Sequence, residues 1–186
     1  MLNVVAITVA TTTTAGIVAA VSGFIDPIAD FDPPYKYRGY NSYYLWSIIK
    51  PLSAFLFPSL AEEVFWRGIF IDPHPSTLLT TASVSSLLPR AGVVVVIHVL
   101  SHPLAGWSVW PRGRKVFCDS RFMLLAIIVL GGATASYLVS GGCIWAAALT
   151  HGLPVALWRD FFGVEAKLMG KTVERNRRSR GDSKNQ

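Results

Sequence analysis

Two adjacent glutamates and an arginine stand in an otherwise apolar stretch, residues 61–70, of this 186-residue chain. Charged side chains at membrane depth cost roughly 2.5–3.5 kcal/mol each, so those present usually pair with one another or serve a pathway or a reaction. On a helix, Glu63 and Arg67 share a face, with the acid N-terminal to the base, which is the favourable order. Glu62 is rotated by about 100° and has no partner on its own helix, which suits a general base or acid. A purely structural role in a helix–helix contact is the alternative.

Three of the four histidines lie in other apolar stretches: His98, His102 and His151. A carboxylate and an imidazole that share a water molecule can deprotonate it, and a further imidazole can stabilise the oxyanion of an attacked amide. We expect Glu62 and His102 to lie at comparable depths, with His151 near the middle of its own span. These groups suit peptide hydrolysis without a covalent intermediate. A proton or ion pathway would use the same titratable side chains.

Zinc chemistry is an open alternative, with Glu62, His102 and His151 as ligands. His98 and His102 also have the i, i+4 spacing that zinc ligands on one helix adopt. No HExxH motif occurs in the sequence, so the glutamate that would stand between two zinc-binding histidines is missing. We therefore expect no cofactor and no metal, and keep zinc as the less favoured possibility.

The composition places these groups in a membrane protein. Hydrophobic residues make up 52% of the chain and charged residues only 15%, against roughly 25% in soluble domains, and the mean hydropathy is +0.43. We expect an all-α, polytopic helical bundle of about five transmembrane spans. The expected spans are 2–24, 53–71, 91–110, 122–139 and 143–158.

Loop signals between these spans divide the chain into three parts. Residues 1–52 would hold the first span, a loop and an interfacial segment, residues 53–163 the core, and residues 164–186 a basic, disordered tail. Pro89 and Arg90 are expected to interrupt the moderately apolar stretch before the third span. The first span has no positive n-region, so a retained span is favoured over a signal peptide.

Basic residues indicate the topology. The net charge is +6, of which residues 111–121 contribute +3 and residues 166–186 contribute +5. Two expected spans separate these segments, so both lie on one side, and the positive-inside rule places that side in the cytosol. The tail is interpreted as a topological anchor for the lipid bilayer, and no nucleic-acid partner is expected. Cys118 and Cys143 show no metal-ligand spacing and are expected to be buried, unbridged thiols.

Three short patterns carry a resemblance to a known family. Glu62 to Arg67 reads EExxxR, and His98 to His102 reads HxxxH. His151 to Val155 begins as HxxxN or HxxxD would, but ends in valine. In this order and in apolar spans, the patterns resemble the CPBP intramembrane proteases, which include CAAX prenyl endopeptidases and bacterial abortive-infection proteins. In that family the second pattern is FxxxH, so a histidine replaces the phenylalanine here. The resemblance covers roughly residues 53–163.

The resemblance implies a metal-free intramembrane endopeptidase. Glu62, aided by His102, would activate water. His151 would polarise the scissile carbonyl or hold the oxyanion, while Arg67 would hold Glu63 and orient the cluster. The implied substrates are peptides or lipidated proteins, including those with a C-terminal CaaX motif. Val155 is the main departure from the family, and it leaves a non-catalytic membrane scaffold or immunity-type relative as the alternative.

Overall fold

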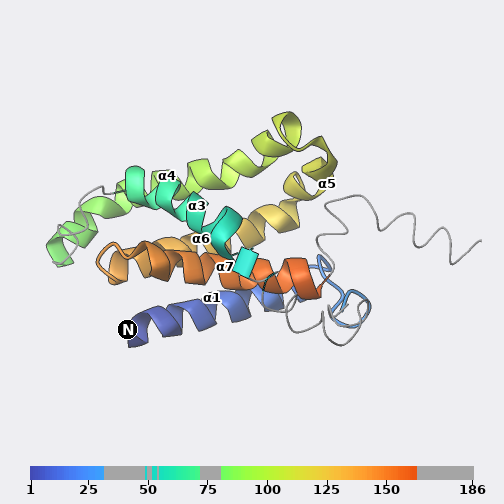
Figure 1. Ribbon diagram of the computed structural model, residues 1–186, viewed down its shortest axis with the longest axis horizontal. Coiled ribbons are helices and arrows are strands. Elements are labelled where there is room, and N and C mark those ends of the chain that lie inside the picture. The colour runs from blue at the N-terminus through green and yellow to red at the C-terminus, as the bar shows by residue number, and fades with distance from the viewer. Residues whose placement is uncertain (32–48, 50–51, 54, 72–80, 163–186) are drawn as a thin grey trace, which may run out of the picture.

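The computed structural model describes residues 1–31, 49, 52–53, 55–71 and 81–162 (Figure 1). Every regular element within these ranges is helical, which confirms the prediction of an all-α bundle. The segment 32–48 and the tail 163–186 lie outside the described residues, and the expected division at residues 52 and 163 stays a prediction. The elements are α1 (Leu2–Val21), η2 (Phe55–Leu60), α3 (Ala61–Glu63), η3 (Val64–Ile69), α4 (Thr81–Ser108), η5 (Pro111–Gly113), α5 (Arg114–Phe117), α6 (Ser120–Val139) and α7 (Ile144–Phe161).

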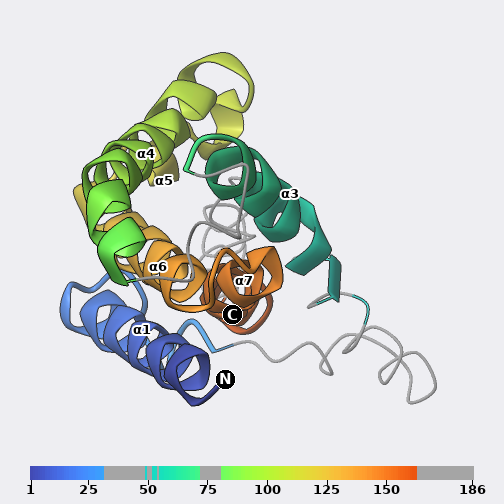
Figure 2. The ribbon, with the colours of Figure 1, turned by 90° about the vertical axis from the view of Figure 1, so that its left-hand side faces the viewer.

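Helix α6 is the centre of the bundle, because it packs against α1, α4 and α7. Helix α1 also packs on α7. The segment formed by η2, α3 and η3 lies against α7 and α4, on the other side of the bundle from α1 (Figure 2). The carboxylates of this segment therefore face two helices that carry histidines.

Small and hydroxyl side chains bring α1 close to its neighbours. A Cβ added at Gly132 of α6 would collide with the side chain of Thr11, so only glycine permits this approach. The hydroxyl of Thr150 on α7 lies 2.7 Å from that of Thr8 and 2.8 Å from that of Ser136 on α6. These buried hydroxyls join three helices at one level, and α1 is a packed part of the bundle.

Three helices are long and apolar enough to cross a membrane: α1, residues 87–108 of α4, and α6. These three helices support an integral membrane protein. The segment 55–69 and α7 are not among the three. The expected second span is also not one continuous α-helix, since Phe57 has an extended backbone (φ −149°, ψ 118°). The following Pro58 disfavours helical dihedrals at the residue before it.

Two expectations about local structure are wrong. Helix α4 continues through Pro89 and Pro103, so Pro89 does not interrupt it. Proline is tolerated in membrane helices, because neighbouring groups and local adjustments satisfy the backbone groups that it frees. Cys118 and Cys143 are free, as expected, but exposed rather than buried. They directly follow α5 and directly precede α7, where the chain leaves the packed interior.

An aspartate begins α6 and an arginine ties it to α1. Asp119 is the N-cap, and its side chain accepts a hydrogen bond from the backbone N–H of Arg121 at 2.9 Å. The Arg121 guanidinium also donates to Asp119 at 3.0 and 2.7 Å, and these hydrogen bonds hold the pKa of the Asp119 carboxyl below its usual value. Another guanidinium nitrogen donates to the carbonyl of Gly23 at 2.9 Å. The end of α1 and the start of α6 are thereby joined.

Candidate active site

The two glutamates lie in α3, between η2, which is broken at the extended Phe57, and η3. Arg67 lies in η3, which has the wider π-type hydrogen-bonding pattern. Single π turns inside helices occur frequently at functional sites. This winding coincides with the stretch whose charges first indicated a site.

Glu63 and Arg67 form an ion pair with no solvent exposure. Nη1 of Arg67 lies 2.7 Å from Oε2 of Glu63, and both side chains are 0% exposed. Nδ1 of His151, on α7, lies 2.8 Å from the other carboxylate oxygen of Glu63. An ionised carboxylate only accepts hydrogen bonds, so Nδ1 of His151 carries a proton and donates it. Glu63 thus connects Arg67 to His151 and is not available as a base.

Arg67 also holds the segment onto α6. Its Nε donates to the hydroxyl of Thr134 at 3.1 Å, and its Nη2 donates to the carbonyl of Leu130 at 2.8 Å. The Thr134 hydroxyl in turn donates to the same Leu130 carbonyl at 2.8 Å. Sequence reasoning missed Thr134, because nothing in the sequence distinguishes it from the other hydroxyl residues of apolar helices.

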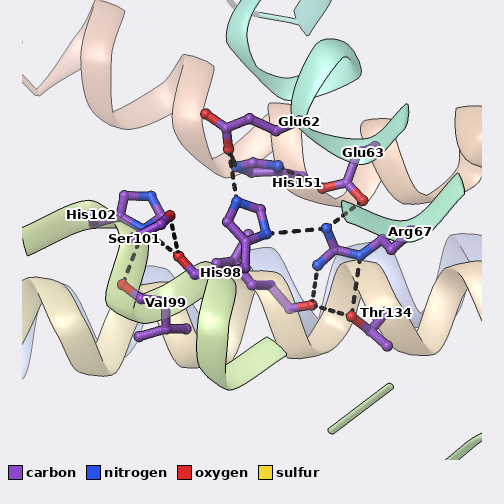
Figure 3. A network of polar contacts seen from close by, with 10 residues as sticks. Glu62, Glu63, Arg67, His98, Val99, Ser101, His102, Thr134 and His151 are labelled. Carbon is purple, nitrogen blue, oxygen red and sulfur yellow. Dashed lines mark hydrogen bonds and ion pairs between the residues drawn. The ribbon is translucent and has the colours of Figure 1, made fainter. Parts of the chain in front are cut away.

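His98 contacts both ends of the charged cluster (Figure 3). Nη1 of Arg67 lies 3.4 Å from Nδ1 of His98, and Nε2 of His98 lies 3.0 Å from Oε2 of Glu62. Arginine only donates, so Nδ1 accepts and the proton of the neutral ring sits on Nε2, where it is donated to Glu62. Trp66 stacks on the ring with centroids 4.8 Å apart. His98 was recognised as a candidate partner, but it was not among the predicted catalytic residues, and the histidine at the family's phenylalanine position was the signal.

His102 lies beside this pair, one turn further along α4. Its Nδ1 is 3.1 Å from the carbonyl oxygen of His98 and 3.3 Å from that of Val99, so Nδ1 donates to the backbone. In the neutral ring, Nε2 therefore carries a free lone pair. The rings of His98 and His102 stack with centroids 5.6 Å apart. A ring nitrogen of His102 lies within 4.8 Å of a carboxylate oxygen of Glu62, so the two side chains belong to one cluster.

Glu62 is the accessible carboxylate of the two. Its side chain is 31% exposed, whereas that of Glu63 is completely buried. Nε2 of His151 lies 4.0 Å from Oε2 of Glu62, too far for a direct hydrogen bond but close enough for both to contact one water molecule. The structure therefore brings together all five predicted site residues, Glu62, Glu63, Arg67, His102 and His151, and adds His98 and Thr134.

Comparison with protein families agrees with this geometry. A family model described as type II CAAX prenyl endopeptidase, Rce1-like, matches residues 44–157, more than half of the chain. The chain belongs to this Rce1-like family. The match confirms the predicted relationship to CAAX-type proteases. No curated protein and no solved structure gave a match.

The Rce1-like match includes all the residues of the cluster. At the level of the family, the activity is that of a CAAX-type intramembrane endopeptidase acting on prenylated proteins. The helices that are apolar enough to span a membrane fit this activity. Membership of the family also makes the non-catalytic scaffold the less favoured alternative.

Among the described residues of this Rce1-like chain, one cluster of three side chains could hold a metal ion. The ligand atoms of Glu62, His98 and His102 all lie within 4.8 Å of one another, and two histidines with one carboxylate suit zinc or iron. A metal ligand needs an unprotonated nitrogen, however, and Nε2 of His98 carries the proton donated to Glu62. Moving that proton to Nδ1 would turn an N–H toward the cationic Arg67. That the site works without a metal stays a prediction.

Proposed function

We propose that this protein is an intramembrane endopeptidase in which Glu62 activates the attacking water. One observation carries the proposal: the partly exposed carboxylate of Glu62 lies near three histidines, with His98 at 3.0 Å and His151 at 4.0 Å. A carboxylate with imidazoles around one water molecule is the arrangement that general-base hydrolysis requires. The other glutamate of the pair is held by Arg67 and His151.

The proposed reaction proceeds by direct attack of water. Glu62 takes a proton from the water while the water oxygen bonds to the carbonyl carbon, and the carbonyl electron pair moves onto its oxygen. The tetrahedral intermediate then collapses, the C–N bond breaks, and the leaving amine takes the proton back from Glu62. Nε2 of His151 would accept the remaining hydrogen of the water, and the ring of His102 beside it would help to orient the water. No covalent enzyme intermediate and no metal take part.

The other residues would position this machinery. His98 donates its Nε2–H to Glu62 and stabilises the ionised carboxylate. Arg67 directs that proton to Nε2 by donating to Nδ1, and it also holds Glu63. Glu63 in turn accepts from His151 and fixes its tautomer. As the neutral tautomer, His151 presents a lone pair, so it would donate to an oxyanion only after protonation.

The family and the proposed topology together indicate the substrate. Rce1-like proteins are CAAX prenyl endopeptidases, and a CaaX motif is the lipidated C-terminus of a protein. His102 lies six residues, or about 9 Å, before the end of α4, and the basic segment 111–121 begins three residues after that end. With this segment and the C-terminal tail in the cytosol, the site would open into the cytosolic half of the membrane. We therefore propose prenylated C-terminal peptides of cytosolic proteins as substrates.

Cleavage of a prenylated CaaX reporter in membranes tests the proposal. Wild type should release the C-terminal tripeptide, while Glu62→Gln and His102→Ala should lose this activity at unchanged protein level. Omitting the prenyl group should reduce kcat/KM, because the lipid supplies binding energy in the bilayer. Undiminished turnover by Glu62→Gln would reject the mechanism. A cellular phenotype that survives Glu62→Gln would favour the scaffold, and pH-driven flux in liposomes would favour an ion pathway.

A further inference from the structure

The proposed reaction needs a hydrogen-bond donor that the cluster around Glu62 does not supply. Charge develops on the carbonyl oxygen during attack, and a preorganised donor to this oxyanion is a major part of catalysis. His98 donates to Glu62, His151 donates to Glu63, and His102 donates to a backbone carbonyl. With neutral rings, these three described histidines have no N–H left for the oxyanion.

Ser59 has the unused donor. Its side chain is completely buried, and among the described residues its hydroxyl has no hydrogen-bond partner. A buried hydroxyl without a partner costs about 1–3 kcal/mol, and a serine within a helix commonly bonds back to a carbonyl of the preceding turn. A buried hydroxyl without a partner is rare in native structures, and a catalytic role is one explanation for it.

The helical position of Ser59 places it on the face that carries the glutamates. It precedes Glu62 by three residues and Glu63 by four, which are the spacings of neighbours on one helical face. Its Cβ would lie 3.4 Å from a Cβ built at Gly152 of α7, the residue directly after His151. Ser59 is therefore packed against α7 immediately beside the proposed catalytic histidine.

The segment 55–69 runs antiparallel to α7. A Cβ at Gly68 would meet Ile144 near the start of α7, whereas Glu63 bonds to His151 further along that helix. Ser59 itself lies beside Gly152, and Val155 follows Gly152 by three residues, on the same side of α7. Val155 has no polar group, although the family pattern has an asparagine or aspartate at this position.

We propose that the hydroxyl of Ser59 donates the hydrogen bond that stabilises the oxyanion of the tetrahedral intermediate. This inference rests on the proposed peptidase function and assigns the donor that its reaction requires. Ser59 would act from η2, where it packs against α7, while Glu62 and His102 activate the water. The valine at position 155 is then compatible with catalysis, because the donor comes from the neighbouring segment instead of from α7.

Measurement of kcat and KM for Ser59→Ala, in the membrane-bound protein, tests the role of the Ser59 hydroxyl as oxyanion donor. Loss of one oxyanion donor should lower kcat by about 100-fold and leave KM nearly unchanged, because the hydrogen bond strengthens in the transition state. The melting temperature should stay the same or rise, since the variant removes a polar group that has no partner. In the Ser59→Ala background, Val155→Asn should restore at least tenfold in kcat by placing an amide at the position where the family pattern has a polar residue.

Thr12→Val is the matched control. The Thr12 hydroxyl on α1 is also buried and has no hydrogen-bond partner among the described residues, but it lies on a helix that contributes nothing to the cluster. This variant should keep the wild-type kcat. An unchanged kcat in Ser59→Ala would overturn the assignment, as would a loss that comes with a lower melting temperature and no recovery by Val155→Asn. Glu62→Gln separates the two proposals, because its continued activity would reject the peptidase mechanism itself.

Discussion

Arg67 and Glu63 form an ion pair that is completely shielded from solvent, with Nη1 2.7 Å from Oε2. Removing one member of such a buried pair leaves an uncompensated charge and typically costs 3–5 kcal/mol. Arg67 has further donors on Thr134, Leu130 and His98, so one side chain holds three helical segments together. The active-site geometry therefore depends on the fork of a guanidinium rather than on positive charge alone.

Arg67→Lys should destabilise the protein strongly, although the charge is kept. A single ammonium group cannot contact Glu63, Thr134 and the Leu130 carbonyl in the geometry of the guanidinium. We expect a loss of about 3 kcal/mol in the free energy of unfolding, seen as a lower melting temperature in detergent. Arg159→Lys is the control, since that side chain is partly exposed and pairs with the adjacent Asp160. Equal melting temperatures for the two variants would contradict this role of Arg67.

His98→Phe replaces the histidine with the residue of the family pattern. The aromatic ring can still stack on Trp66, but the N–H that stabilises ionised Glu62 is lost. Glu62 would then ionise only at higher pH, so the acidic limb of the kcat/KM profile should move upward by on the order of one pH unit. His98→Gln keeps a donor and should move the profile less. If His98→Phe leaves the limb in place, His98 does not act through Glu62.

Removal of divalent metals should leave the activity unchanged. In the proposed reaction Glu62 takes the proton of the water directly, and His98 uses its Nε2–H for Glu62 rather than binding a metal. Incubation of the membranes with a strong zinc chelator should change kcat/KM by less than about twofold. Metal analysis of the purified protein provides an independent measurement. Activity lost to the chelator and restored by zinc would instead identify Glu62, His98 and His102 as metal ligands.

Asp119→Ala should weaken the start of α6 without affecting the chemistry. An N-cap aspartate contributes typically about 1 kcal/mol, and here it also binds Arg121, which reaches Gly23. The pKa of Asp119 is lowered from 3.8 by Arg121, so its contribution is present above that pH and is lost as the pH falls through the lower value of the folded state. The melting temperatures of wild type and Asp119→Ala should thus converge in acid. A constant difference down to the lowest pH would contradict this assignment.

The sequence predicted contacts within one helix better than contacts between helices. The pairing of Glu63 with Arg67 follows from their four-residue separation, and the hydrophobic composition was sufficient to predict a membrane bundle. The bonds from His98 to Glu62 and from Arg67 to Thr134 depend on how α3, α4 and α6 pack, which local spacing does not determine. Proline rules also failed at Pro89, where the helix continues.

The number of spans was predicted less well, for a physical reason. Three of the five expected spans correspond to long apolar helices, whereas the segment 55–69 is kinked at Phe57 and carries the charges of the site. The same charges that indicate function lower the hydropathy on which counting spans depends. The role of Ser59 was missed as well, because the lack of a hydrogen-bond partner is visible only in three dimensions.

The most direct test of the central claim compares wild type, Glu62→Gln and Glu63→Gln for cleavage of a prenylated reporter in native membranes at equal protein level. Glu62→Gln should give no measurable cleavage of the reporter. Its melting temperature should stay close to that of wild type, since Glu62 is partly exposed. Glu63→Gln should lower both activity and melting temperature, because it breaks the buried pair with Arg67. Cleavage by Glu62→Gln at the wild-type rate would contradict the account.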